Sequence, residues 1–229
     1  MSLWSRFGQF AESIGSGGAH LLDRISSAFS SSAGLSVAFT AAMIALSAKM
    51  AKADGIVTQD EVVAFREIVE IPEGQEKHVI RLFNLAQSDV AGFDVYARRI
   101  AALFPDEPET LVDIIDGLFH IAKADGVVHE NELAFLEAVA EIFKIDSHRF
   151  RQIKARHIDD PTPDPYVILG ITDDVGEAEL KAQYRRLVSE NHPDRLTARG
   201  VPEEFVKLAN ERLAAINGAW AQIRKERDF

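Results

Sequence analysis

Apolar residues recur at helical spacing along most of the chain, and they predict an all-α protein. From residue 33 to 156 the pattern is helical throughout, with amphipathic helices expected over 76–86 and 93–104. Further on, a helix over 177–191 buries one face against a later helix that Pro202 starts. The facing side chains are Leu180, Tyr184 and Leu187, and opposite them Phe205, Leu208, Ala209, Leu213, Ile216 and Trp220. We therefore expect a helical bundle followed by a hairpin of two antiparallel helices.

A short motif occurs twice in the first part of the chain. Residues 51–55 read AKADG, and 122–126 repeat these letters. Each copy fits a helix that ends at the Asp-Gly pair, since glycine readily takes the left-handed conformation of a C-terminal cap. Thr58 and Glu61 then form a capping box that starts the next helix, whereas His129 is a poorer cap in the second copy. The bundle therefore contains a duplicated helix–turn–helix unit, and contact between the copies would explain why both are apolar.

The stretch 33–51 is the nearest approach to a membrane span, and the duplication argues against one. It is rich in alanine, and Ser36, Thr40 and Ser47 interrupt it. The second copy carries Asp113, Asp116 and His120 where the first carries Ala42, Ala45 and Lys49. Two buried carboxylates would be expensive inside a bilayer. Because both copies should build the same unit, we expect 33–51 to be a buried core helix.

Residues 1–32 form an amphipathic appendage to the bundle. Two apolar sets at helical spacing lie on either side of a glycine-rich break: Leu3, Phe7, Phe10 and Ile14, then Leu21, Leu22, Ile25 and Phe29. The simplest interpretation is a pair of short helices packed on the bundle. The alternative is contact with a membrane surface, for which only Arg6 and Arg24 supply basic charge. No continuous apolar region typical of a secretory signal precedes the glycines.

The turns after the two AKADG motifs are acidic, which raises the question of a metal site. Asp-Gly followed by glutamate six residues later matches the second half of a calcium loop. The earlier ligand positions fall on apolar and lysine residues in both copies and supply no carboxylate. We favour helix caps, since acidic residues at helix N-termini are stabilising without a metal. A divalent-metal site of another kind is the alternative, with candidate ligands Asp54, Asp60, Glu61, Asp125, Glu130 and Glu132.

The repeated KADG-x-V-x-x-x-E pattern in an acidic helical region resembles the TerB (tellurite-resistance B-like) domain. The resemblance covers residues 33–156 and implies an all-α bundle with an internal duplication. It also implies a family that is sometimes associated with metal binding or with membrane-linked stress systems.

Composition narrows the classes of function. A net charge of −11 argues against a general nucleic-acid binder, because binding phosphates requires a basic surface. Residues 1–162 carry a net charge of −9 and 163–229 only −2, which suggests two modules with different partners. The absence of cysteine excludes disulfides, thiol catalysis and cysteine metal sites. Between the modules, 157–165 reads HIDDPTPDP and is expected to be an extended, semi-rigid linker.

The tripeptide His192-Pro193-Asp194 directly follows the helix expected over 177–191. Proline restricts the residue before it to extended geometry and ends the helix, so the tripeptide would project at a fixed angle. Asp194 is then a rigidly placed acceptor for an arginine of a partner. A catalytic His192–Asp194 dyad is disfavoured because the nearest hydroxyl, Ser189, lies on the preceding helix. A plain role as a helix-capping loop is the remaining alternative.

A basic face precedes this tripeptide. Lys181 and Arg185 are four residues apart on the exposed side of the helix, and Arg186 is adjacent. Such a patch suits an acidic groove on a protein partner and speeds encounter more than it adds affinity. An ordinary solvated helix face is the alternative, but the coincidence with the tripeptide favours a binding site.

Residues 163–229 resemble the J-domain of DnaJ-type co-chaperones. The resemblance rests on the opening DPYVILGI, the basic run KAQYRR, the sequence HPDR and the segment AAINGAW. A J-domain after a TerB-like domain is similar to the DjlA branch of that family. The chain departs from this branch in lacking a clear N-terminal membrane anchor, and Trp220 stands where tyrosine is usual.

The J-domain resemblance implies a partner and a role. The partner is the nucleotide-binding domain of a DnaK-type ATPase chaperone, which the chain biases toward ATP hydrolysis; unfolded client proteins are reached only indirectly, and the chain is not itself an enzyme. The implied partner-binding residues are Lys181, Tyr184, Arg185, Arg186, His192, Pro193, Asp194 and Arg195.

Two hypotheses about function follow. The first is a co-chaperone without a cofactor, located in the cytoplasm, with peripheral contact at the inner face of a membrane as an alternative. The second is a metal-responsive TerB-like stress or adaptor protein in which the J-like hairpin is secondary. Stimulation of a chaperone ATPase and binding of a divalent metal are the measurements that separate them.

Overall fold

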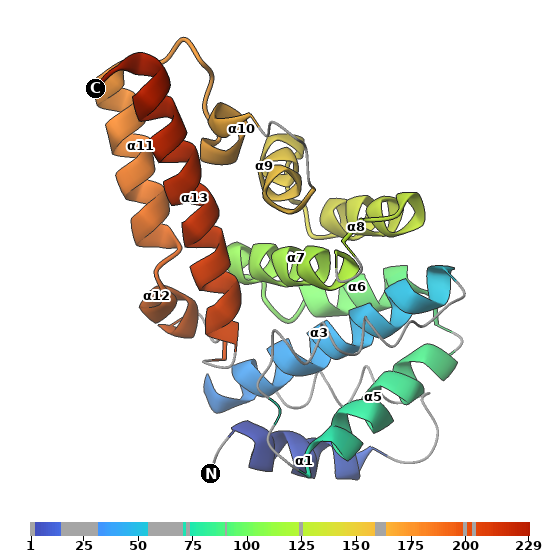
Figure 1. The fold of residues 1–229 in the computed structure, drawn as a ribbon. Helices are drawn as coiled ribbons and strands as arrows, with labels where there is room; N and C mark the ends of the chain where they lie inside the picture. Colours follow the sequence, from blue (N-terminus) through green and yellow to red (C-terminus); the bar gives the residue numbers. More distant parts are fainter. Residues whose placement is uncertain are drawn as a thin grey trace.

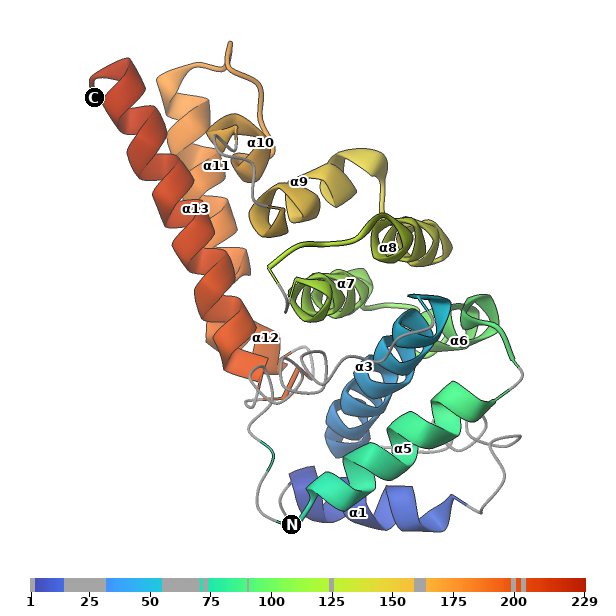
Figure 2. The same cartoon turned by 45° about the vertical axis from the view of Figure 1, so that its right-hand side comes forward.

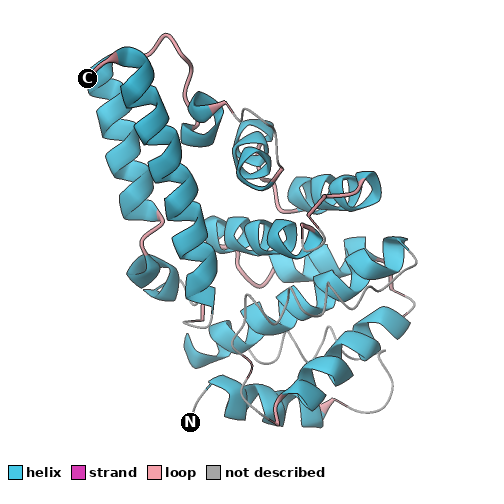
Figure 3. Ribbon diagram, in the orientation of Figure 1, coloured by secondary structure: helices cyan, strands magenta, loops and turns pink. Residues whose placement is uncertain are grey.

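The computed structural model describes residues 3–14, 32–54, 71, 74–89, 91–123, 126–158, 164–198, 201–202 and 205–229. Every regular element in these ranges is a helix, which confirms the all-α prediction (Figure 1, Figure 3). The bundle consists of α1 (Leu3–Ser13), α3 (Ser32–Asp54), α5 (Glu76–Ser88), α6 (Phe93–Ala101), α7 (Pro108–Ala122), α8 (Glu130–Ile142) and α9 (Ser147–His157). The hairpin consists of α10 (Pro165–Leu169), α11 (Glu177–Glu190), α12 (Pro193–Ala198) and α13 (Val206–Arg227).

Helix α3 is the centre of the bundle. Between Val37 and Ala51 its side chains are almost completely buried, and α1, α5, α6, α7 and α8 pack around it. A helix that is apolar on all sides needs such a surrounding of protein or of lipid. The prediction of a buried core helix is therefore confirmed over 37–51, and the side chains of 33–35 lie outside the described ones. None of the helices in the described part of the chain combines the length and the apolarity that a membrane crossing requires.

The second copy of the duplicated unit consists of α7, a turn and α8. Gly126 in the turn has a φ of 97°, the left-handed conformation predicted for it. A carboxylate oxygen of Glu132 accepts a hydrogen bond from the backbone N–H of His129 at 2.9 Å, so one half of a capping box starts α8. Helices α3 and α7 contact each other, as expected, and a Cβ at Gly117 would lie only 2.6 Å from the Met43 methyl group. The turn of the first copy lies outside the described residues.

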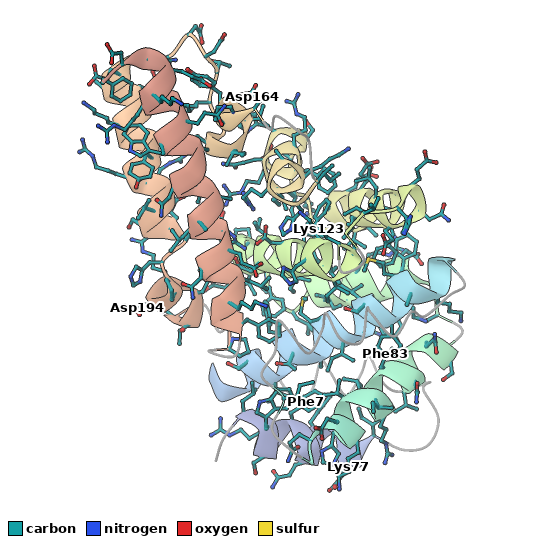
Figure 4. All side chains as sticks on the ribbon, in the orientation of Figure 1. Phe7, Lys77, Phe83, Lys123, Asp164 and Asp194 are labelled. Carbon is teal, nitrogen blue, oxygen red and sulfur yellow. The ribbon has the colours of Figure 1, made fainter. Side chains whose placement is uncertain are left out.

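Helix α1 packs on the bundle with the apolar face that the sequence predicts. Trp4, Phe7 and Ile14 are buried, and the helix lies against α3 and α5. Figure 4 shows Phe7 between α1 and the neighbouring helices. Nη2 of Arg81 in α5 donates to the carbonyl of Ile14 at 2.6 Å and fixes the end of this segment. The interpretation of a packed helix is thus confirmed for α1; the second apolar set of the appendage lies outside the described residues.

In the hairpin, α11 and α13 run antiparallel and α10 packs across them (Figure 1). Leu180 and Leu187 of α11 are fully buried against Ile216 of α13, as predicted. The polar loop expected between the two helices contains the short helix α12, and α13 begins after Pro202 rather than at it. The side chain of Leu196 in α12 is buried in the core of the bundle, and this contact holds the loop against the protein.

The predicted apolar stripe of α13 divides between two cores. Its second half, including Ile216, faces α11, whereas its first half joins the core of the bundle. There the ring of Phe205 meets the ring of Phe39 in α3 edge to face, with 4.9 Å between the centroids. Figure 2 shows the first turns of α13 on the side of α7 and of the beginning of α3. The hairpin and the bundle are therefore joined by a shared helix. Of the linker expected over 157–165, His157 ends α9, and 159–163 lie outside the described residues.

Candidate partner-binding site

The tripeptide forms the start of α12. The carbonyl of His192 accepts hydrogen bonds from the backbone N–H groups of Arg195 at 2.9 Å and Leu196 at 3.3 Å. Its imidazole Nδ1 accepts from the backbone N–H of Asp194 at 3.2 Å, which makes histidine an N-terminal cap. Pro193 occupies the first helical position, where its fixed φ suits the helix and its missing N–H removes no bond. The capping role considered from the sequence is thus part of the geometry.

The cap leaves the tripeptide accessible. The side chain of His192 is 54% exposed and that of Asp194 is 91% exposed. The shortest approach between the two, from Nδ1 to Oδ2, is 3.5 Å, so the carboxylate is not tied to the ring by a close bond. Figure 4 shows Asp194 at the outer edge of α12, away from the bundle. The carboxylate is therefore presented to solvent on a short helix that is anchored from behind.

A shallow groove of 420 Å³ runs from α11 to α12. Its walls are Tyr184, Arg185, Val188, Ser189, His192, Asp194 and Arg195. Five of the eight residues predicted for partner binding therefore surround one groove. Pro193 lies between two of them and sets their spacing.

The other two predicted cations lie outside the groove walls. Lys181 pairs with Glu177 one turn earlier, and its ammonium group lies 5.2 Å from the centre of the Phe229 ring. Arg186 donates from Nη2 to the side-chain oxygen of Gln183 at 2.7 Å. Exposed contacts of this kind contribute only about 0–1 kcal/mol each to stability. Because the contacts are weak, Lys181 and Arg186 still add to the positive electrostatic potential of α11. Arg185 has no ionic partner among the described residues and is the most available cation of the face.

Tyr184 joins the groove to the hairpin core. Its ring stacks on Trp220 of α13 with 4.5 Å between the centroids. Its hydroxyl donates to the side-chain oxygen of Asn217 at 2.9 Å. Tryptophan at position 220 thus supplies a flat surface for this ring, and Tyr184 also lines the groove.

A buried cluster of charges lies directly behind the tripeptide and joins the hairpin to the bundle. At its centre is Arg212 of α13, whose Nε and Nη2 donate to Oδ2 of Asp116 at 3.0 and 2.8 Å. Its Nη1 donates to Oδ1 of Asp113 at 2.8 Å and to Oδ1 of Asn191 at 2.9 Å. Asn191 caps the end of α11 and directly precedes His192. One guanidinium thus connects two carboxylates of α7 with the start of the tripeptide.

Helix α9 completes this cluster. Oδ1 of Asp116 accepts from Nη2 of Arg156 at 2.7 Å and lies 3.0 Å from Nε2 of His157. Burial opposes ionisation of Asp116, but Arg212 and Arg156 outweigh it and hold the pKa of this carboxyl well below its ordinary value. Burial also opposes the charge of Arg212, yet Asp116 and Asp113 raise its pKa above the ordinary value. Two carboxylates balance two guanidiniums, which is what burial of such groups requires.

The sequence predicted part of this cluster. Burial of Asp113 and Asp116 was expected from the duplication and is confirmed, since both are at most 2% exposed. Arg212 and Asn191 were missed. Their signal was present: Arg212 lies four residues after Leu208 and four before Ile216, on the buried side of its helix.

The acidic metal candidates fall mostly outside the described side chains. This holds for Asp54, Asp60, Glu61 and Asp125. Of the two that are described, Glu132 is buried and caps α8, and Glu130 is exposed in the first turn of that helix. No group of three or more metal-binding side chains occurs within the described ranges.

Comparison with known proteins finds two families along the chain. The family described as tellurite resistance protein TerB matches residues 40–155, and the DnaJ domain matches residues 164–223. The co-chaperone protein DjlA of Coxiella burnetii is 28% identical over 200 residues, which cover 79% of this chain and 74% of the relative. The protein of the same name from Photobacterium profundum is 25% identical over 217 residues, covering 83% and 78%. No solved structure matches the chain. The chain belongs to the TerB family and carries a DnaJ domain directly after its TerB domain.

Proposed function

We propose that this protein is a co-chaperone that docks on a DnaK-type ATPase chaperone and stimulates its ATP hydrolysis. The observation that carries the proposal is the groove in which His192, Asp194 and Arg195 meet Tyr184 and Arg185 of α11. These side chains are presented outward on elements whose other faces are buried. The DnaJ domain match and the co-chaperone name of the relatives support the same role.

The basic residues and Asp194 have different roles in docking. Arg185, supported by Lys181 and Arg186, attracts an acidic surface of the ATPase and raises the rate of encounter. Asp194 then accepts hydrogen bonds from an arginine of the partner, a charge-assisted contact that fixes orientation. The chain binds and orients but does no bond chemistry itself. Unfolded clients are affected indirectly, through the chaperone.

We place this activity in the cytoplasm. The absence of cysteine fits a reducing compartment. The apolar face of α1 is packed against α3 and α5, which favours a structural role for this helix over contact with a membrane surface.

A single-turnover ATPase assay with a DnaK-type chaperone tests the proposal. The wild type should raise the hydrolysis rate, and His192→Gln should abolish the increase while its circular dichroism spectrum stays unchanged. Arg185→Ala should raise the concentration needed for half-maximal stimulation, most strongly at low ionic strength, because salt screens exposed charges. Lys225→Ala removes an exposed cation of α13 away from the groove and serves as the matched control. Equal rates for wild type and His192→Gln would refute the proposal.

A further inference from the structure

We infer that the TerB domain positions the His192-Pro193-Asp194 tripeptide through Arg212. The activity of the J-domain then depends on contacts with the bundle. The inference rests on the proposed function, because the property at stake is how well the tripeptide stimulates the chaperone ATPase. It adds Asp113, Arg212 and Asn191 as positioning residues.

Arg212 connects the bundle directly to the residue before the tripeptide. A single nitrogen of Arg212, Nη1, donates to Asp113 of the bundle at 2.8 Å and to Asn191 of the hairpin at 2.9 Å. The side-chain N–H₂ of Asn191 donates in turn to the carbonyl of Leu187 at 2.7 Å, the last core residue of α11. Asn191 is 4% exposed and is followed by His192. A buried chain of hydrogen bonds therefore runs from α7 to the residue at which the tripeptide begins.

The connection through Arg212 is rigid. The guanidinium is planar and its donors have fixed directions, so bonding two carboxylates and an amide at once determines its position. An unpaired partner in this buried site would be costly, which holds all four groups to one arrangement. The direction in which α11 ends, and α12 starts, is thereby set from the bundle.

The bundle contacts the segment that carries the tripeptide on its buried side and leaves the side chains of His192 and Asp194 exposed. Leu196 of α12 and Phe205 before α13 are both buried in the bundle core. The exposed carboxylate of Asp194 lies on the opposite side, beside the groove. The TerB domain thus does not compete with the partner for this surface.

A neighbouring contact supplies a matched control. His120 Nδ1 of α7 lies 2.8 Å from a carboxylate oxygen of Glu211, the residue before Arg212. This pair also joins α7 to α13, but no hydrogen bond connects it to Asn191 among the described residues. Glu211→Gln therefore weakens the same interface without breaking the link to the tripeptide.

The test compares full-length variants by two readouts. Asn191→Ala breaks the link at the hairpin and changes no charge; Asp113→Ala breaks it at the bundle; Asp113→Asn keeps an acceptor for Arg212. The first readout is the NMR resonance of the His192 imidazole in the free protein, assigned by its absence in His192→Gln. The second is the single-turnover ATPase rate over a range of co-chaperone concentrations.

We expect Asn191→Ala and Asp113→Ala each to shift the His192 resonance and to lower the maximal stimulated rate by about tenfold. The concentration for half-maximal stimulation should change less than about twofold, since the basic face of α11 is untouched. Asp113→Asn should restore most of the rate, and Glu211→Gln should leave both readouts near wild type.

An unchanged His192 resonance in folded Asn191→Ala and Asp113→Ala would overturn the inference, as would equal effects of Glu211→Gln. If Asp113→Ala does not fold, Asn191→Ala decides alone. If the wild type fails to stimulate the ATPase, the proposed function is wrong, and the resonance of the free protein still decides whether the bundle positions the tripeptide.

Discussion

The carboxylate of Asp116 should contribute more to stability than any exposed charge of the protein. It receives hydrogen bonds from Arg212, Arg156 and His157 at 2.7 to 3.0 Å. Asp116→Asn keeps the shape but leaves two buried guanidiniums with the single carboxylate of Asp113. Removing one partner of a buried ion pair costs about 3–5 kcal/mol, a large part of a total stability of about 5–15 kcal/mol. For a chain of this length, the Tm should fall by about 6–20 °C.

Urea denaturation followed by far-UV circular dichroism measures this loss. Asp94→Asn is the control, because it removes a half-exposed carboxylate that pairs with Arg98 one turn along, and it should change the free energy of unfolding by less than about 0.5 kcal/mol. A loss below about 1 kcal/mol in Asp116→Asn would refute the argument that the cluster depends on this charge.

The dependence on pH gives an independent check on the same carboxyl. Its pKa in the folded protein lies well below the ordinary 3.8, so the stabilisation is complete above that value and is lost as the pH falls through the folded-state pKa. The difference in unfolding free energy between wild type and Asp116→Asn should be constant from about pH 8 to 5 and begin to shrink below about pH 4. A difference that shrinks already between about pH 8 and 5 would contradict this assignment.

Two further predictions concern packing and backbone. Phe205→Ala should lower the free energy of unfolding by about 3–5 kcal/mol in urea denaturation, because the ring is fully buried against Phe39. The fluorescence of the two tryptophans, Trp4 in the bundle and Trp220 in the hairpin, and far-UV circular dichroism should still report one transition; separate transitions would show that the bundle and hairpin unfold independently. Gly126→Ala should cost about 1 kcal/mol, since a φ of 97° strains any other residue. Gly218→Ala, in the interior of α13 with open space around an added Cβ, should instead stabilise by about 0.5–1 kcal/mol; the same sign for both would be inconsistent with the backbone argument.

The helices and the tripeptide were predictable because their signals are local. The turn at Gly126 and the facing of α11 and α13 follow from spacing within a few residues. Burial of 33–51 needed one comparison beyond local spacing, with the second copy of the repeat and its two aspartates. Helix α12 was missed because six residues are too few to show a helical period. Its position depends instead on the burial of Leu196 in a core made by distant helices.

The pairing of Arg212 with the two buried aspartates was missed for a different reason. Arg212 pairs with Asp116 and Asp113 across 96 and 99 residues of sequence, and no local pattern encodes such a contact. A single arginine in an apolar stripe is usually taken as its polar border, since long cations tend to keep the charge in water. The two aspartates on α7 were the better indication, because buried carboxylates require cations from another element.

Because α13 belongs to both cores, the core of the bundle can be completed only late in synthesis. Domains of a nascent chain generally fold as units while synthesis proceeds at about 5–20 residues per second. The core around α3 includes Phe205 and Leu208, which are synthesised much later than α3 itself. This core therefore stays incomplete for on the order of ten seconds after α3 leaves the ribosome. During that time an apolar helix lacks part of its cover, which is the kind of surface that chaperones bind. The nascent chain thus has, for a while, the properties of a client.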